Sequence, residues 1–195
     1  LGLIEALRQI KPGWKQLELA HRIDRDTSGC VVVCKNSICL KHIQREFKAK
    51  TINKTYLALV HGRWPKEIKA VDAPLEKSEV KEGEKVVRVN ESGKPSYTAF
   101  TPKEYFDGAT LMEARPETGR THQIRVHCQH AGHAILGDER YTQLHAAPQF
   151  RSLKNLCLHA WKIEFSLPER AEKVSVEAPL EEQLEGFIRS LKNSQ

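Results

Sequence analysis

His21-Arg22-Ile23-Asp24-Arg25-Asp26-Thr27-Ser28-Gly29 is the stretch from which we interpret the rest of the chain, because five of its nine side chains are charged or titratable. It lies between apolar residues at 17–20 and the β-branched run Val31-Val32-Val33, which is typical of a buried strand. Burying carboxylates and guanidinium groups is costly unless they pair, and the places that tolerate this cost are often chemical sites. We therefore predict a charged loop held against a core.

Length and composition fit one globular domain. The 195 residues are enough for one sizeable core, with 29% charged and 39% hydrophobic residues. No apolar run approaches the roughly 20 residues that cross a bilayer, so we expect no membrane association. Lys and Arg outnumber Asp and Glu by 31 to 25, which is compatible with a polyanionic partner and equally with an ordinary basic surface.

The cysteines indicate the cellular compartment that we expect for the protein, and the first residue indicates where its domain begins. The five cysteines are odd in number and form no C-x-x-C pair, so we expect reduced thiols in a cytoplasmic protein. The chain starts at Leu1 and its only methionine is Met112. We therefore expect residues 1–195 to be a single domain cut at its N-terminus from a longer protein.

The expected elements favour an α+β fold around a mixed, mainly antiparallel sheet with helices and loops on both sides. The 3.6-residue spacing of apolar positions predicts helices over 3–9, 38–47, 121–131 and 180–191, with Asn36-Ser37 and Thr121 as caps of the second and third. Alternating or β-branched runs predict strands over 17–20, 30–34, 55–60, 96–106, 110–114, 156–167 and 174–176. Residues 76–93 are charge-rich and predict a projecting hairpin or loop.

Asp24 and Asp26 compete for the reactive role in the opening stretch. Paired carboxylates can share general acid–base work or bind a metal ion. Asp26 fits a capping role ahead of Thr27-Ser28-Gly29, which has typical turn chemistry. Asp24, flanked by Arg22 and Arg25, is the better reactive candidate, since a nearby guanidinium keeps a carboxylate ionised.

A second charged region surrounds the helix expected from Thr121. Arg115, Arg120 and Arg125 bracket its start, where backbone N–H groups and a positive dipole end suit a phosphate or carboxylate. Arg125 lies about one turn inside this helix and can instead reach an internal carboxylate such as Asp24. Tyr56 lies in a strand; it is either a β-favouring aromatic or a residue that stacks on a base or exchanges a proton.

Four histidines of this region, His122, His127, His130 and His133, invite comparison with a zinc site. They lack the two-plus-two spacing of structural zinc sites and the H-E-x-x-H of zinc proteases. We therefore favour helix-surface or hydrogen-bonded core histidines and predict no metal.

Taken together, these motifs resemble the RluA-type pseudouridine synthases. The opening stretch matches the H-R-L-D-x-x-T-S-G signature of that family. Three further blocks follow in the expected order: Lys54-Thr55-Tyr56, the run from Gly119 to His127, and Gly132-His133 leading to Leu136-Gly137-Asp138. The similarity extends over nearly the whole chain and is greatest to family members that act on 23S rRNA of the large ribosomal subunit.

The resemblance implies an enzyme that isomerises uridine to pseudouridine within RNA, on the pseudouridine synthase fold and without a cofactor or metal. Asp24 matches the catalytic aspartate, Tyr56 the tyrosine that stacks on the target base, and Arg125 the basic residue that pairs with the aspartate. Arg22 is suited to fill the gap left by a flipped uridine. Arg120 and His122, in the second block, are expected to bind the RNA as well.

The departures from the family pattern are small, and other functions stay open. Ile23 replaces the usual leucine, and Ala134 stands where the family often has proline. Members of the expected type carry an upstream S4-type RNA-binding domain, which is missing from these residues. The alternatives are a tRNA-directed synthase of the same family, a non-catalytic RNA-binding protein, and a metal-dependent nuclease. We expect a monomer.

Overall fold

The computed structural model describes residues 2–79, 85–142, 150, 153, 155–168 and 172–193. Its elements in chain order are α1 (Leu3–Ile10), β1 (Glu18–Leu19), β2 (Ser28–Gly29), β3 (Val33–Cys34), α2 (Ser37–Ala49), β4 (Asn53–His61), β5 (Ala70–Asp72), β6 (Leu75–Glu79), β7 (Lys85–Val89), β8 (Tyr97–Phe106), β9 (Ala109–Pro116), α3 (Gln123–His130), β10 (Leu158–Ser166), β11 (Lys173–Glu177) and α4 (Glu182–Asn193).

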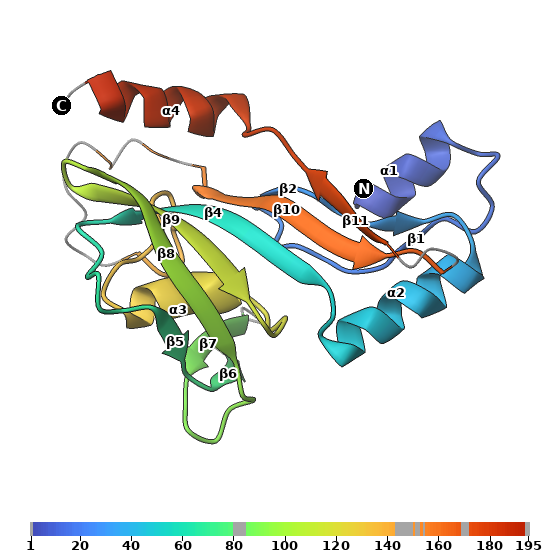
Figure 1. Cartoon of the computed structure of the whole chain (residues 1–195), viewed down its shortest axis with the longest axis horizontal. Coiled ribbons are helices and arrows are strands. Elements are labelled where there is room, and N and C mark those ends of the chain that lie inside the picture. The colour runs from blue at the N-terminus through green and yellow to red at the C-terminus, as the bar shows by residue number, and fades with distance from the viewer. Residues whose placement is uncertain are drawn as a thin grey trace.

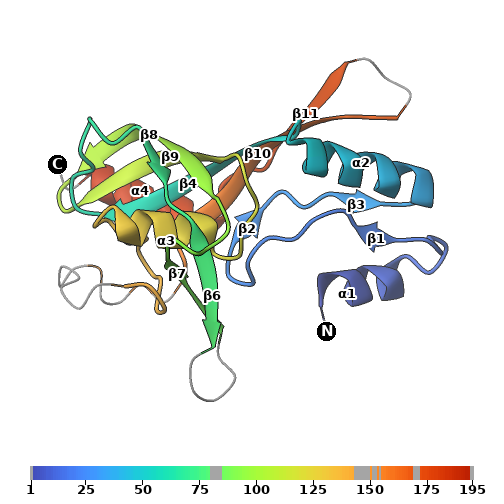
Figure 2. The ribbon, with the colours of Figure 1, turned by 90° about the horizontal axis from the view of Figure 1, so that it is seen from below.

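The central sheet is mixed and mainly antiparallel, which confirms the predicted α+β class. Its strand order is β11-β10-β4-β9-β8-β5, and β2 adds the one parallel pairing, to β10. Helices α3 and α4 lie on opposite sides of this sheet, while α1 and α2 lie at the end formed by β10 and β11 (Figure 1). Strands β6 and β7 pair antiparallel as a hairpin beside α3 (Figure 2), as predicted for residues 76–93, of which 80–84 lie outside the described residues.

Strand β4 connects the two halves of the fold. Residues from Asn53 to Ala58 pair with β10 and residues from Tyr56 to His61 pair with β9, so β4 lies between these two strands in the interior of the sheet. The core around it is apolar and fully buried, with Leu59 and Val60 both at 0% exposure. Leu184 and Ile188 of α4 join the same cluster of buried side chains. This burial of apolar surface is the main stabilising contribution to the fold.

Helix α2 packs on the outer half through Ile43, which is buried with Cys34, Ile52 and Ile163. Its predicted cap is confirmed, because the side-chain oxygen of Asn36 accepts a hydrogen bond from the Cys39 N–H at 2.8 Å. Ile38 was expected on the apolar face, but it is 71% exposed, because it lies in the first turn, beyond the edge of the contact.

The prediction of a buried strand over residues 30–34 is wrong. Only Val33–Cys34 form a strand, paired with β1 in a separate two-stranded sheet, and Val31, Val32 and Val33 are half-buried. The chain pairs with β10 only at Ser28-Gly29 and then leaves the central sheet. One side of the β-branched run therefore stays accessible, which its sequence alone does not reveal.

Gly29 fixes the end of the charged loop against β10. Its φ is +108°, and a Cβ there would lie 2.2 Å from the Ala160 carbonyl oxygen. The same carbonyl accepts a hydrogen bond from the Cys30 N–H at 2.8 Å. Only glycine allows this conformation and approach, so residues 21–28 are held at a defined place beside the sheet.

Two further results complete the comparison with the predicted elements. The short edge strand β5 was missed, because its three residues have no recognisable alternation. Among the described residues, every helix is too short or too polar to cross a bilayer.

Candidate active site

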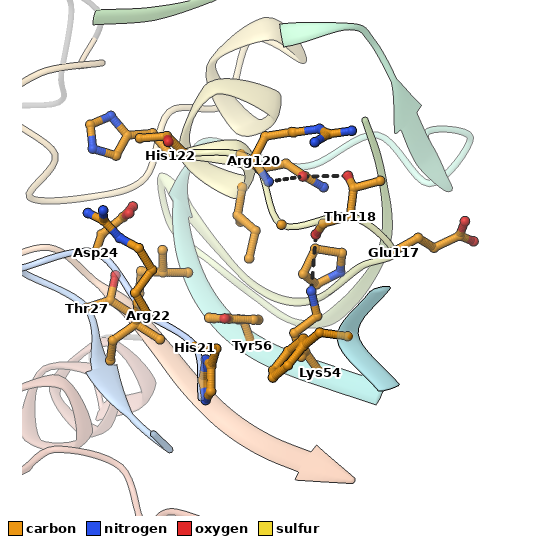
Figure 3. A pocket seen from close by; sticks show the side chains of 18 of the residues that line it. His21, Arg22, Asp24, Thr27, Lys54, Tyr56, Glu117, Thr118, Arg120 and His122 are labelled. Atoms are coloured by element: carbon orange, nitrogen blue, oxygen red, sulfur yellow. Dashed lines mark hydrogen bonds between the residues drawn. The ribbon is translucent and has the colours of Figure 1, made fainter. Parts of the chain in front are cut away.

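Three segments that are distant in sequence surround one cavity of about 480 Å³. The charged loop contributes His21 to Asp24 and Thr27, β4 contributes Lys54 and Tyr56, and the segment 116–124 forms the facing wall (Figure 3). Phe47 and Lys48 of α2, Lys50 at the end of that helix and Leu158 of β10 complete the lining. This volume lies in the range of small-ligand sites and suits a single nucleotide.

Asp24 points into this cavity from the loop (Figure 3). Its side chain is only 18% exposed, and Oδ2 lies 3.6 Å from Nη1 of Arg125. The contact that the sequence suggested between these two residues is therefore present.

Arg125 has a second and closer carboxylate partner, Asp138. Asp138 Oδ2 accepts from Arg125 Nε at 2.7 Å, and Oδ1 accepts from Nη2 at 2.8 Å. The two side chains are 7% and 0% exposed, so the pair is buried behind the cavity. Burial alone would lower the pKa of Arg125, but the bonds to Asp138 and the charges of Asp138 and Asp24 raise it. Bidentate pairing fixes the plane of the guanidinium group that faces Asp24.

Tyr56 and Lys54 line the cavity from alternate positions of β4 (Figure 3). Burial, and then the charge of Asp24, raise the pKa of Tyr56 to about 12, so the phenol keeps its proton near neutral pH. Burial also lowers the pKa of Lys54 to about 8. Lys54 Nζ donates to the Thr118 carbonyl at 3.1 Å, which ties β4 to the facing wall.

His21 has a structural role at the start of the loop. Its Nε2 accepts a hydrogen bond from the Val32 N–H at 3.0 Å, and its ring packs 5.1 Å from that of Phe47. Burial lowers its pKa to about 4, so the ring is neutral at pH 7. The acceptor role of Nε2 requires this neutral form.

The segment 116–124 is organised by Gln123 rather than by the predicted Thr121 cap. Helix α3 begins at Gln123 after His122, which has a φ of 53° and makes no side-chain cap. The Gln123 side-chain oxygen accepts from Thr118 Oγ1 at 2.6 Å and from the Arg120 N–H at 3.0 Å. The Thr121 prediction is therefore wrong, because a buried glutamine side chain closes the turn from inside the helix.

Of the residues expected to bind RNA, Arg22, Arg120 and His122 all line the cavity (Figure 3). Arg22 and Arg120 are exposed at its edge. Arg120 also lines a second cavity, of about 490 Å³, beneath the β6–β7 hairpin with Lys77 and Lys94. His122 Nδ1 shares a 2.7 Å hydrogen bond with the Tyr141 hydroxyl, and burial is the main cause of its lowered pKa.

The other candidate groups are placed elsewhere. Asp26 is exposed, and its predicted cap is not among the hydrogen bonds of the described residues. His127 is fully buried, and its ring nitrogens bond Thr98 Oγ1 at 2.9 Å, Ser96 Oγ at 3.1 Å and the Ala73 carbonyl at 3.1 Å. This is the hydrogen-bonded core histidine that we favoured. The described residues contain no group of His, Cys, Asp or Glu arranged for a metal ion.

The sequence pattern of the RNA pseudouridylate synthase family matches residues 5–130 of this chain. The chain belongs to the RNA pseudouridylate synthase family. Curated relatives are named ribosomal large subunit pseudouridine synthase C. The Vibrio vulnificus protein is 48% identical over 99% of this chain and 61% of its own length. The Pasteurella multocida protein is 46% identical over 98% and 59%, and the Escherichia coli protein 43% identical over 99% and 62%.

The chain thus spans about three fifths of the length of these family members. Solved structures agree on the pseudouridine synthase fold. Human RNA pseudouridylate synthase domain containing 1 matches with a TM-score of 0.74 at 25% identity, over 96% of this chain and 84% of that one. Human RNA pseudouridylate synthase domain containing 4 matches with a TM-score of 0.76 at 23% identity, over 97% and 82%.

Within this family fold, sequence reasoning missed one charged group of the site. Asp138 was quoted only as part of a motif, yet it is the residue that holds Arg125. A signal for it was present, because Asp138 closely follows the apolar run Ala134-Ile135-Leu136. A carboxylate at the end of a buried run needs a cationic partner.

Proposed function

We propose that this protein converts uridine to pseudouridine within RNA, with 23S rRNA of the large ribosomal subunit as its substrate. The observation that supports this most strongly is that Asp24 and Tyr56 line one cavity of nucleotide size, with Arg125 3.6 Å from Asp24 behind it. The names of the curated relatives support the choice of ribosomal RNA. The proposal includes a cytoplasmic monomer that acts without a cofactor or metal.

The reaction breaks the N-glycosidic bond, turns the uracil, and joins its C5 to the same sugar carbon. In this proposal Asp24 is the carboxylate that acts on the nucleotide, and the buried guanidinium of Arg125 lies 3.6 Å from its Oδ2. Tyr56 packs on the uracil, and its phenol is neutral at working pH. It can donate its proton to N1 once the glycosidic bond is broken, and the resulting phenolate can take the proton that leaves C5 when the new C–C bond has formed.

The position of the cavity supports a flipped target. A uridine within stacked RNA hides its reactive atoms and must leave the stack to reach Asp24. The exposed Arg22 lies at the edge of the cavity, where it can occupy the space left in the RNA. Arg120 and His122, on the facing wall, are proposed to contact the RNA as it enters.

Asp24→Asn tests the proposed function. We expect this variant to fold and to bind undermodified 23S rRNA but to form no pseudouridine, as read by carbodiimide treatment and primer extension. Asp26→Asn is the matched control: it removes the same charge two residues away on an exposed side chain and should retain activity. Appreciable product from Asp24→Asn would refute the assignment of Asp24.

The same assay separates the alternatives. Wild-type protein that modifies tRNA transcripts but not 23S rRNA would point to the tRNA-directed activity. Wild-type protein that binds RNA and modifies neither would point to a non-catalytic RNA-binding protein.

A further inference from the structure

Thr27 carries a buried hydroxyl without a partner. Its side chain is 8% exposed, and Oγ1 makes no hydrogen bond to any residue that the structure describes. Among the described residues it is the only buried side-chain polar atom in that condition. Buried hydroxyl groups are almost always paired, so this exception requires an explanation.

Thr27 also lines the proposed catalytic cavity (Figure 3). Its N–H donates to the Asp24 carbonyl at 3.1 Å, which closes the turn between the two residues. The next residue contrasts with it, because Ser28 Oγ bonds His159 Nδ1 at 2.8 Å within the protein. The loop therefore pairs the Ser28 hydroxyl internally and leaves the buried hydroxyl of Thr27, a residue that lines the cavity, unpaired.

We propose that the Thr27 hydroxyl is a substrate-binding group that hydrogen-bonds the target nucleotide beside Asp24. This inference rests on the proposed function. A hydroxyl both donates and accepts, so it can bond a uracil carbonyl, the uracil imino group or a ribose hydroxyl. In each case the ligand of the Thr27 hydroxyl is a polar group of the one nucleotide that lies beside the Asp24 carboxylate.

The surroundings of Thr27 hold this hydroxyl in place before the nucleotide arrives. Thr27 is β-branched, which restricts the rotation of its side chain. Gly29, two residues on, is locked against the Ala160 carbonyl. A hydroxyl held in place in this way loses little conformational entropy when the nucleotide binds. A substrate without a polar group at this position would leave the Thr27 hydroxyl unpaired and would bind more weakly.

Thr27→Val tests this role, because valine keeps the shape and removes the hydroxyl. We expect kcat/KM for pseudouridine formation to fall about tenfold, with Thr27→Ser close to wild type. The melting temperature of Thr27→Val should not fall, since no bond within the protein is lost. Ser28→Ala is the control for stability, and its melting temperature should fall because its bond to His159 is lost.

Two RNA probes identify the part of the nucleotide that is bound. If Thr27 bonds the base, wild type and Thr27→Val should bind an RNA with an abasic target site equally well. If it bonds the ribose, they should bind a 2′-deoxy target equally well. Either result supports the inference when the two proteins differ on the unmodified RNA.

The outcomes that overturn the inference are distinct from failure of the proposed function. Active wild-type protein with a Thr27→Val variant of equal kcat/KM refutes the role of Thr27 alone. A fall in melting temperature like that of Ser28→Ala would show a structural role instead. Wild-type protein that forms no pseudouridine overturns both proposals.

Discussion

Replacing Asp138 by asparagine removes the negative charge that fixes Arg125 and keeps the size of the side chain. Asp138 Oδ1 accepts from Arg125 Nη2 and from the N–H groups of Arg140 and Tyr141 at 2.8, 3.0 and 3.1 Å. Oδ2 accepts from Arg125 Nε at 2.7 Å. The amide oxygen of asparagine can replace Oδ1. Its NH2 group then faces the Nε–H of Arg125, and because both groups are hydrogen-bond donors, no hydrogen bond forms between them.

The size of the effect follows from this geometry. Removing one partner of a buried ion pair costs about 3–5 kcal/mol, because a charge stays buried without compensation. Asp24 remains 3.6 Å from Arg125 Nη1, so part of the compensation is kept. We therefore expect Asp138→Asn to lower the free energy of unfolding by about 3 kcal/mol, or the melting temperature by about 6–12 °C.

Urea denaturation of wild type and variant at pH 7 measures this loss. Glu18→Gln is the matched control, since Glu18 and Arg8 lie 2.6 Å apart but are 53% and 46% exposed. Exposed pairs contribute about 0–1 kcal/mol, so this variant should differ little from wild type. If Asp138→Asn lost less than about 1 kcal/mol, as for an exposed pair, the buried pair would not have the structural role assigned to it.

Two further predictions concern His21 and Tyr56. Burial lowers the pKa of folded His21 to about 4, below the 6.5 of an unfolded chain, so its stabilisation is present above pH 6.5 and is lost as the pH falls to 4. His21→Gln keeps an acceptor for the Val32 N–H but has no group that titrates in this range. When the pH is lowered from 7 to 4.5, the free energy of unfolding should fall by about 2–3 kcal/mol less in this variant than in wild type. Equal falls in the two proteins would refute this prediction. Tyr56→Phe should bind RNA normally but form pseudouridine slowly in single-turnover assays, because it lacks the phenolic proton. A rate near that of wild type would leave Tyr56 a packing role only.

Local patterns in the sequence predicted much of the fold. The sheet class, the strands predicted over 96–106 and 110–114 with the turn pair Asp107-Gly108 between them, the Asn36 cap and the β6–β7 hairpin are present in the described part of the chain. Each depends on neighbours in the chain, such as alternating apolar residues, a turn pair or a capping side chain. Local sequence patterns of this kind predict the structure correctly because, at these positions, contacts with distant segments do not override them.

The wrong and missed features depend on contacts between distant segments. Val31-Val32-Val33 is half-buried because the chain leaves β10 after Ser28-Gly29, and Val33 then pairs with β1 in a separate two-stranded sheet. The Thr121 cap fails because the Gln123 side chain occupies the turn. The unpaired Thr27 hydroxyl is visible only once β10 and the loop are placed together, since its sequence context is an ordinary turn.

Tyr141 connects the projecting hairpin to the candidate active site, a link that no local sequence pattern predicts. Its hydroxyl accepts from the Val87 N–H of β7 at 3.1 Å and shares a 2.7 Å bond with His122. Its ring lies 5.1 Å from the guanidinium carbon of Arg125. A buried side chain with three such contacts makes the position of the hairpin depend on the groups around Asp24. The position of the hairpin relative to the cavity is therefore set by direct contacts within the protein.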